Sequence, residues 1–205
     1  MIAICDYDAG NIMSVQKACH YLGHEYVLTR DAGQILAADH VILPGVGSFG
    51  DAMERLHSYG LDDVLKEVKK KGTPLLGICL GLQLFFEESD ETPGVKGLGL
   101  LPGRIIRIPD QGGELKIPHM GWNSICYPNP GRLFSDIPEG TDVYFVHSYY
   151  LPMNLDTASF KVTACSEYGV TIGASVEQEN LFACQFHPEK SGTWGLKILE
   201  NFLRL

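Results

Sequence analysis

The stretch LLGICLGLQLFF, residues 75–86, indicates the fold class because its hydrophobic periodicity changes at Cys79. Up to the cysteine the residues form a short apolar run, which is typical of a strand buried on both faces. After it, the apolar residues follow the spacing of a helix. A strand that passes directly into a helix, with a cysteine between Gly77 and Gly81, has the form of a nucleophile elbow in which cysteine replaces serine.

The segments before this stretch repeat the same order of strand and helix. Apolar runs predict strands over residues 1–8, 25–31, 40–47 and 74–79. Amphipathic spacing predicts helices over residues 11–23, 49–72 with an interruption near Gly60, and 80–89. This alternation predicts right-handed crossovers and a parallel sheet that helices cover on both faces.

In the second half of the chain the regular alternation of strands and helices stops. Short strand candidates separated by turns predict hairpins over residues 99–108, 119–127, 142–151, 160–169, 170–178 and 181–189. Helical spacing returns over residues 191–205. We therefore predict a single α/β domain over residues 1–205: a three-layer, doubly wound, mostly parallel sheet with an antiparallel extension.

Composition excludes several classes of function. A formal net charge of −9 over 205 residues argues against a nucleic-acid-binding surface. No segment approaches the roughly 18 apolar residues that span a bilayer, and acidic residues follow too early for a signal peptide. We therefore expect a cytoplasmic protein that binds neither nucleic acid nor membrane.

The six cysteines lie far apart, without a CxxC pair or a Cys/His cluster. This spacing indicates neither a metal site nor a disulfide scaffold. Most of the cysteines are therefore expected to be reduced and to act as small core residues.

Cys79 stands at the carboxyl end of a predicted parallel strand, where ligands and catalytic groups gather in such sheets. The dipole at the start of the following helix favours a thiolate. The backbone N–H of Leu80 is positioned to help form an oxyanion hole. Since G-x-C-x-G is a weak signal by itself, a buried structural cysteine remains the alternative.

A cysteine nucleophile needs a base, and the base needs a group that orients it. Among the seven histidines, His187 is the favoured base because Glu189 follows two residues later and projects to the same side of an extended chain. Pro188 between them favours the extended geometry. The spacing allows a Cys-His-Glu triad. His147 remains the alternative base.

The segment LPGVGSFG, residues 43–50, follows the third predicted strand. Its turn, containing Pro44, Gly45 and Gly47, can bring backbone amides to a developing oxyanion. The same residues fit G-x-G-x-x-G, so a phosphate-binding loop is the alternative, although no acidic ribose partner supports a dinucleotide site.

Together, PGVGSFG, GICLGLQLFF and QFHPEKS closely resemble, in order and spacing, the class I glutamine amidotransferases. The resemblance covers essentially the whole chain. It implies hydrolysis of glutamine through a γ-glutamyl thioester without a cofactor. By position it makes Cys79 the nucleophile, His187 the general acid and base, and Glu189 the carboxylate that orients the histidine.

The resemblance also implies how glutamine is held. Gln83 would contact the bound glutamine, and Ser148 and Tyr149 would hold its backbone groups. The backbone of the turn and of the residue after the nucleophile would hold the oxyanion; these positions are Gly45, Val46, Gly47 and Leu80.

Within that class, DYDAGNIMSV, KIPHMGWN and FVHSYY most resemble the glutaminase subunits of imidazole glycerol phosphate synthases, which serve histidine biosynthesis. This implies a heterodimer with a (β/α)8 cyclase that uses the ammonia. It also implies an interface near Asn11 and the segment from Met120 to Trp122, although Trp122 could equally be a core residue. One departure is Asp8, where many members have glycine; we expect this position to be structural or at the interface.

Three rival functions stay open at this point. The chain could supply ammonia to another synthase, such as anthranilate or aminodeoxychorismate synthase. It could be a free-standing cysteine hydrolase, which would act without a partner. It could also be a non-catalytic binding subunit that keeps the fold, although such a module has no need of the full triad.

Overall fold

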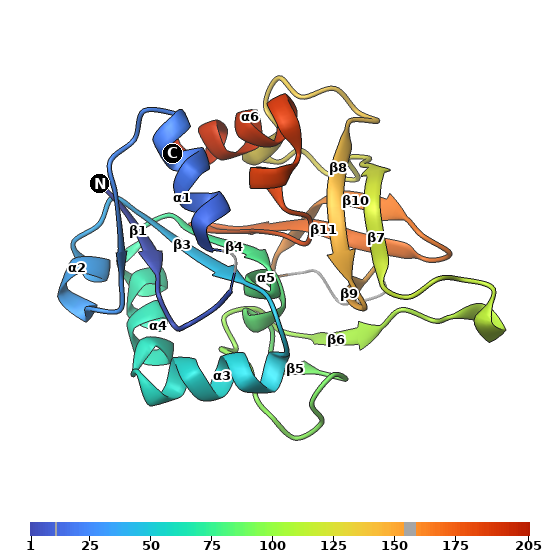
Figure 1. Cartoon of the computed structure of the whole chain (residues 1–205), viewed down its shortest axis with the longest axis horizontal. Helices are drawn as coiled ribbons and strands as arrows, with labels where there is room; N and C mark the ends of the chain where they lie inside the picture. The colour runs from blue at the N-terminus through green and yellow to red at the C-terminus, as the bar shows by residue number, and fades with distance from the viewer. Residues whose placement is uncertain (11, 154–158) are drawn as a thin grey trace.

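The computed structural model describes residues 1–10, 12–153 and 159–205 (Figure 1). Its centre is a parallel sheet with the strand order β2-β1-β3-β4-β12. The strands are β1 (Ile2–Cys5), β2 (Tyr26–Thr29), β3 (His40–Gly45), β4 (Leu75–Cys79) and β12 (Leu181–Cys184). The predicted parallel sheet is therefore confirmed.

Beyond β12 the sheet continues mainly through antiparallel pairs, as the sequence predicts, and only its last pair is parallel. Strand β12 pairs with β11 (Thr171–Gln178), which also pairs with β10 (Lys161–Glu167) and β9 (Tyr149–Pro152). Strand β9 pairs with β6 (Arg104–Arg107), and β6 pairs with the short β5 (Glu88–Ser89). A separate antiparallel pair consists of β7 (His119–Ser124) and β8 (Asp142–His147).

Several predicted elements are wrong in extent. The expected strand over residues 181–189 ends at Cys184, and Glu189 lies in a short 3₁₀ helix (Pro188–Lys190) rather than in an extended segment. The expected strand over residues 142–151 is divided at Ser148 into β8 and β9, which belong to different sheets. Aromatic and β-branched residues continue through this segment, so the sequence does not indicate where the strand changes from one sheet to the other. The expected helix over residues 80–89 ends at Leu84, and its last residues enter β5.

Helices cover both faces of the parallel sheet. Side chains of α1 (Ile12–Tyr21) and α6 (Gly192–Leu203) share one core with Ile4 and Ile42 of the sheet. Side chains of α2 (Ala32–Leu36), α3 (Phe49–Ser58), α4 (Leu61–Lys71) and α5 (Leu80–Leu84) share a second core with Cys5 and Leu43. This division follows the alternation of side chains along each strand.

Short 3₁₀ helices complete the description: η1 (Gln111–Gly113), η2 (Arg132–Phe134) and η3 (Pro188–Lys190). Gly60 has a φ of 67° and separates α3 from α4, which confirms the predicted interruption. Among the residues described, no helix has the length and apolar character needed to cross a bilayer.

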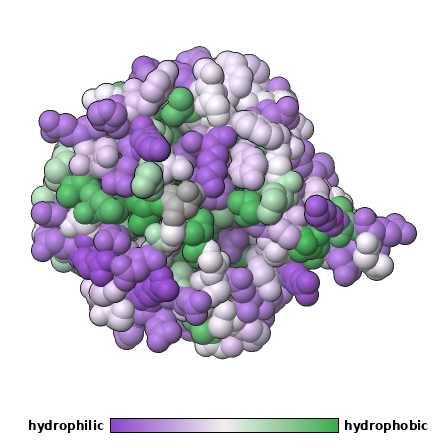
Figure 2. Space-filling view, viewed as in Figure 1, coloured by the Kyte–Doolittle hydropathy of each residue, from purple (hydrophilic) through white to green (hydrophobic). Residues whose placement is uncertain are grey.

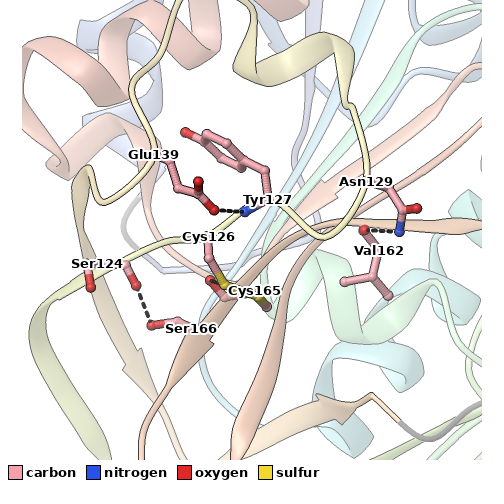
Figure 3. The surroundings of a disulfide bond; sticks show 8 residues. All are labelled: Ser124, Cys126, Tyr127, Asn129, Glu139, Val162, Cys165 and Ser166. Carbon is pink, nitrogen blue, oxygen red and sulfur yellow. Dashed lines mark hydrogen bonds between the residues drawn. A yellow bond between two sulfur atoms is a disulfide. The ribbon is translucent and has the colours of Figure 1, made fainter.

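The expectation of reduced core cysteines is wrong for one pair. Cys126 and Cys165 form a disulfide with a Cα–Cα distance of 5.2 Å (Figure 3). The bond ties the segment after β7 to β10, where the two residues also exchange backbone hydrogen bonds of 2.8 and 2.9 Å. A separation of 39 residues gives no local signal of such a contact. The other four cysteines are free and buried.

Candidate active site

A cavity of about 330 Å³ lies where β3 and β4 end, beside the segment that joins β8 to β9. A volume in this range suits a small-molecule ligand. Except for Glu91, the residues that line it come from five of the six motifs quoted from the sequence: Val46, Gly47, Cys79, Leu80, Gln83, Glu91, Pro118, Val146, His147, Ser148, Tyr149 and His187.

Cys79 stands at the sharp turn from β4 into α5, with φ 55° and ψ −106°. A non-glycine residue at positive φ is strained and persists only where its surroundings impose it. Here the neighbours impose it by close packing. A Cβ on Gly77 would lie 2.7 Å from the carbonyl oxygen of Gly81, and a Cβ on Gly81 would lie 2.0 Å from that of Leu43. The glycines on both sides therefore permit the elbow, as the sequence predicts.

His187 and Glu189 form a buried pair behind the cavity. The Nδ1 of His187 lies 2.8 Å from Oε1 of Glu189, and the two side chains are 2% and 1% exposed. The pairing fixes the ring and directs Nε2 away from the glutamate; Nε2 is buried and has no hydrogen-bond partner among the described residues. Burial lowers the pKa of His187, but the nearby Cys79 and the hydrogen-bonded Glu189 outweigh burial and raise the pKa to about 9. The raised pKa favours the protonated imidazolium of His187 in the pair with Glu189.

His147, the alternative base, also lines the cavity, but both of its ring nitrogens are occupied. Nδ1 lies 2.8 Å from the carbonyl oxygen of Tyr149, and Nε2 lies 3.1 Å from Nδ1 of His119. Because a carbonyl can only accept, Nδ1 of His147 carries the proton, and Nε2 accepts one from His119. Burial lowers the pKa of His147 to about 3. The geometry therefore favours His187 as the base.

The predicted glutamine-binding residues divide into two groups. Six of them line the cavity: Val46, Gly47, Leu80, Gln83, Ser148 and Tyr149. Gly45 does not; it pairs in register with Cys79 on the neighbouring strand. A Cβ at Gly45 would lie 2.6 Å from the hydroxyl oxygen of Tyr7, so this glycine permits close packing beneath the site.

The start of α3 decides between the two interpretations of the glycine-rich segment. Ser48 caps this helix, and Oε2 of Glu91 accepts a hydrogen bond of 2.7 Å from the backbone N–H of Phe49. A carboxylate thus occupies the position at which a phosphate would bind. The phosphate-binding alternative is therefore not supported.

Glu91 is a cavity residue that belongs to none of the motifs recognised in the sequence. It follows β5, shortly after the motif that ends at Phe86, and its place in the cavity comes from the contact of its carboxylate with the start of α3. Burial raises its pKa, while the hydrogen bond from Phe49 acts in the opposite direction. The carboxylate is placed to accept a hydrogen bond from a positively charged group in the cavity.

Two of the three predicted interface residues can be located. Met120 and Trp122 are 60% and 58% exposed on β7, so the alternative that Trp122 is a core residue is wrong. Asn11 lies outside the described residues. Figure 2 shows that hydrophobic side chains also gather in a band across the middle of the face that Figure 1 presents.

The local structure explains how aspartate is accommodated at position 8, where many family members have glycine. Asp8 has a φ of 60°, a conformation that glycine adopts without cost. Its side chain bonds the Tyr59 hydroxyl and, at 2.7 Å, the Arg30 guanidinium; these hydrogen bonds lower its pKa. Asp8 therefore compensates for the strained backbone with side-chain contacts that a glycine would lack.

Among the described residues, no group of His, Cys, Asp and Glu side chains could hold a metal ion.

Comparisons with known proteins identify the family of the chain. The family model of glutamine amidotransferase class I matches residues 3–205. A relative from Moorella thermoacetica, the imidazole glycerol phosphate synthase subunit HisH, is 52% identical over 98% of this chain and 93% of its own length. The protein of the same name from Dehalococcoides mccartyi is 46% identical over 100% of this chain and 97% of its own length.

Solved structures with low sequence identity share the fold. A crystal structure of a glutamine amidotransferase superposes with a TM-score of 0.76 at 20% identity, covering 99% of this chain and 97% of the other. The glutaminase domain of Trypanosoma brucei CTPS, solved with bound acivicin, has a TM-score of 0.65 at 15% identity, covering 99% and 93%. Because the family model and the relatives span nearly the whole chain, the protein belongs to the class I glutamine amidotransferase family.

Proposed function

We propose that this chain is the glutaminase subunit of an imidazole glycerol phosphate synthase, acting as one domain over residues 1–205. It hydrolyses glutamine to glutamate and ammonia and delivers the ammonia to a cyclase subunit in histidine biosynthesis. The observation that carries the proposal is the buried His187–Glu189 pair beside Cys79, whose strained elbow faces a cavity of small-molecule size.

The first half of the reaction forms a thioester. The Cys79 thiolate attacks the γ-carbonyl carbon of glutamine, a C–S bond forms, and the carbonyl oxygen becomes an oxyanion. His187 gives the proton from Nε2 to the amide nitrogen, the C–N bond breaks, and ammonia leaves. Backbone N–H groups of Leu80 and of the Val46–Gly47 turn stabilise the oxyanion, each by about 3–4 kcal/mol where the geometry is complete.

The second half releases glutamate. His187, now neutral, takes a proton from water, whose oxygen attacks the thioester carbon. The C–S bond breaks, and the thiolate of Cys79 is restored. Glu189 holds Nδ1 throughout, which keeps the histidine in the orientation that both steps need.

The cavity suits the remaining groups of glutamine. Glu91 is placed to accept hydrogen bonds from the α-ammonium group. Ser148 and Tyr149, together with Gln83, hold the backbone and amide groups. The exposed pair Met120 and Trp122 on β7 presents apolar area for the cyclase, a (β/α)8 barrel that forms the heterodimer.

The test measures glutamate release from glutamine by the purified chain, alone and with the cyclase and its ribonucleotide ligand. Low release by the chain alone and a large rise in the complex would support the proposal, with Cys79→Ala as the inactive control. Equal release with and without the cyclase would point to a free-standing hydrolase or to another synthase. No release from a verified complex would refute the assignment of Cys79.

A further inference from the structure

The sulfur of Cys79 has two polar neighbours besides the histidine. The carbonyl oxygen of Val146 lies 3.8 Å from Sγ, and Nε2 of Gln185 lies 3.7 Å from it. Gln185 is completely buried, on the segment between β12 and η3. A buried amide beside a nucleophile is a group that the triad mechanism does not use.

The orientation of this amide follows from its hydrogen-bond partners. The carbonyl oxygen of Tyr149 can only accept, so the amide group of Gln83 that lies 3.1 Å from it must be the NH₂. The same nitrogen lies 3.1 Å from Gln185, which must therefore present its oxygen. The NH₂ of Gln185 then faces the sulfur.

The carbonyl of Tyr149, on which this assignment depends, belongs to a longer series of hydrogen bonds. The Tyr149 carbonyl also accepts from Nδ1 of His147, whose Nε2 accepts from His119. Asn123 on β7 lies 3.3 Å from Nε2 of His119. In this series of hydrogen bonds, each group is fixed as donor or acceptor by its neighbour. Rotating the Gln185 amide would therefore break its hydrogen bond with Gln83 and turn its oxygen toward the sulfur.

We propose that Gln185 is a catalytic residue of the glutaminase reaction, because its Nε2–H donates a hydrogen bond to the Cys79 thiolate. This rests on the proposed function, since it assigns a role at the same nucleophile. The Val146 carbonyl can bond the thiol but repels a thiolate, so the Gln185 amide is the neutral partner that favours the charged form. The same bond stabilises the thiolate that leaves when water cleaves the thioester.

The test compares the rate of Cys79 alkylation by iodoacetamide, across pH, in wild type and Gln185→Glu. The variant keeps an oxygen for Gln83 but places a second oxygen against the sulfur. We expect the pH of half-maximal rate to rise by about one unit or more, which is about tenfold less thiolate at neutral pH. The ionisable neighbours Tyr7, Cys184, His187 and Glu189 are left in place.

Two further variants separate the hydrogen bond from other effects. Gln185→Met has a similar length and no donor, and it should shift the alkylation profile in the same direction. Gln34→Glu makes the same chemical change on an exposed surface of α2 and should leave the profile unchanged. An unshifted profile in both Gln185 variants would overturn the proposal.

A measurement on the wild type covers the case in which the Gln185 variants do not fold. The side-chain ¹⁵N–¹H signal of Gln185 should change with pH alongside Cys79 alkylation and should be independent of this transition in Cys79→Ser. If the Gln185 signal depends on pH in the same way in both proteins, the hydrogen bond is refuted. Glutamate release, assayed separately, reports on the proposed function: an active enzyme with an unshifted alkylation profile would overturn only the role of Gln185.

Discussion

Acidification from pH 7 to pH 5 is expected to weaken the fold through the buried pair His119 and His147. The two side chains are 3% and 6% exposed, and their rings lie next to each other, with Nδ1 of His119 bonded to Nε2 of His147. His119 also stacks between Phe145 and Tyr168, with ring centroids 4.7 and 4.0 Å away. Neither ring has an acidic partner among its described hydrogen bonds, so a proton added to either would remain uncompensated in the interior.

The magnitude follows from proton linkage. Burial lowers the pKa of His119 to about 4 and that of His147 to about 3, whereas both are near 6.5 when unfolded. A lowered pKa gives stability that is present above about pH 6.5 and is lost as the pH falls toward the folded value. At pH 5 the unfolded chain binds a proton at each histidine and the folded chain does not, which costs about 2 kcal/mol per histidine.

His187 acts in the opposite direction. Its folded pKa is raised to about 9, so its contribution is complete below about pH 6.5 and is lost as the pH rises through 9. Between pH 7 and pH 5 the contribution of His187 to the free energy of unfolding increases by about 1 kcal/mol. The three histidines together are therefore expected to lower the free energy of unfolding by about 3 kcal/mol between pH 7 and pH 5.

The assay is urea unfolding at pH 7 and pH 5, with the free energy of unfolding extrapolated to water. His119→Gln cannot take up the proton, so its loss should be about 2 kcal/mol smaller than that of the wild type. His20→Gln, at an exposed position of α1, should behave as the wild type does. If His119→Gln and the wild type lose the same free energy, the linkage argument is wrong.

Three other substitutions test the packing. Gly81→Ala would place a Cβ 2.0 Å from the Leu43 carbonyl oxygen, so we expect a loss near 3 kcal/mol in urea unfolding together with loss of glutaminase activity; wild-type stability would contradict the close packing at the elbow. Cys126→Ser opens a loop of 39 residues and should cost about 4 kcal/mol under oxidising conditions. With dithiothreitol present the difference from wild type should vanish, and a persisting difference would mean that packing rather than the disulfide is responsible. Asp8→Gly should leave Tm nearly unchanged, because relief at φ 60° offsets the lost contact with Arg30, whereas Asp8→Val should lower Tm by several degrees; equal Tm values for the two variants would refute this balance.

Much of the architecture was predictable because the hydrophobic periodicity of each segment indicates its secondary structure. The change of period at Cys79 predicts the passage from β4 into α5, and Gly60 predicts the break between α3 and α4. Local patterns failed where a strand changes its partner. Ser148 interrupts no hydrophobic pattern, yet it separates β8 from β9, because the division depends on which sheet each half can reach.

The types of residue that can carry the chemistry are evident from sequence. Cys79 between glycines and His187 two residues before Glu189 are spacings that a triad needs, and local geometry is enough to suggest them. Sequence could not choose finally between His187 and His147 as the base. The structure favours His187, because both ring nitrogens of His147 are already hydrogen-bonded.

Which distant groups share the site depends on the folded chain. Gln185 reaches Cys79 because β12 lies beside β4 in the sheet, and Glu91 reaches the cavity because the chain after β5 returns to the start of α3. The pairing of Cys126 with Cys165 has the same origin. These contacts depend on strand order and on the packing of segments far apart in the chain, and the periodicity of a single segment carries no information about its neighbours in space.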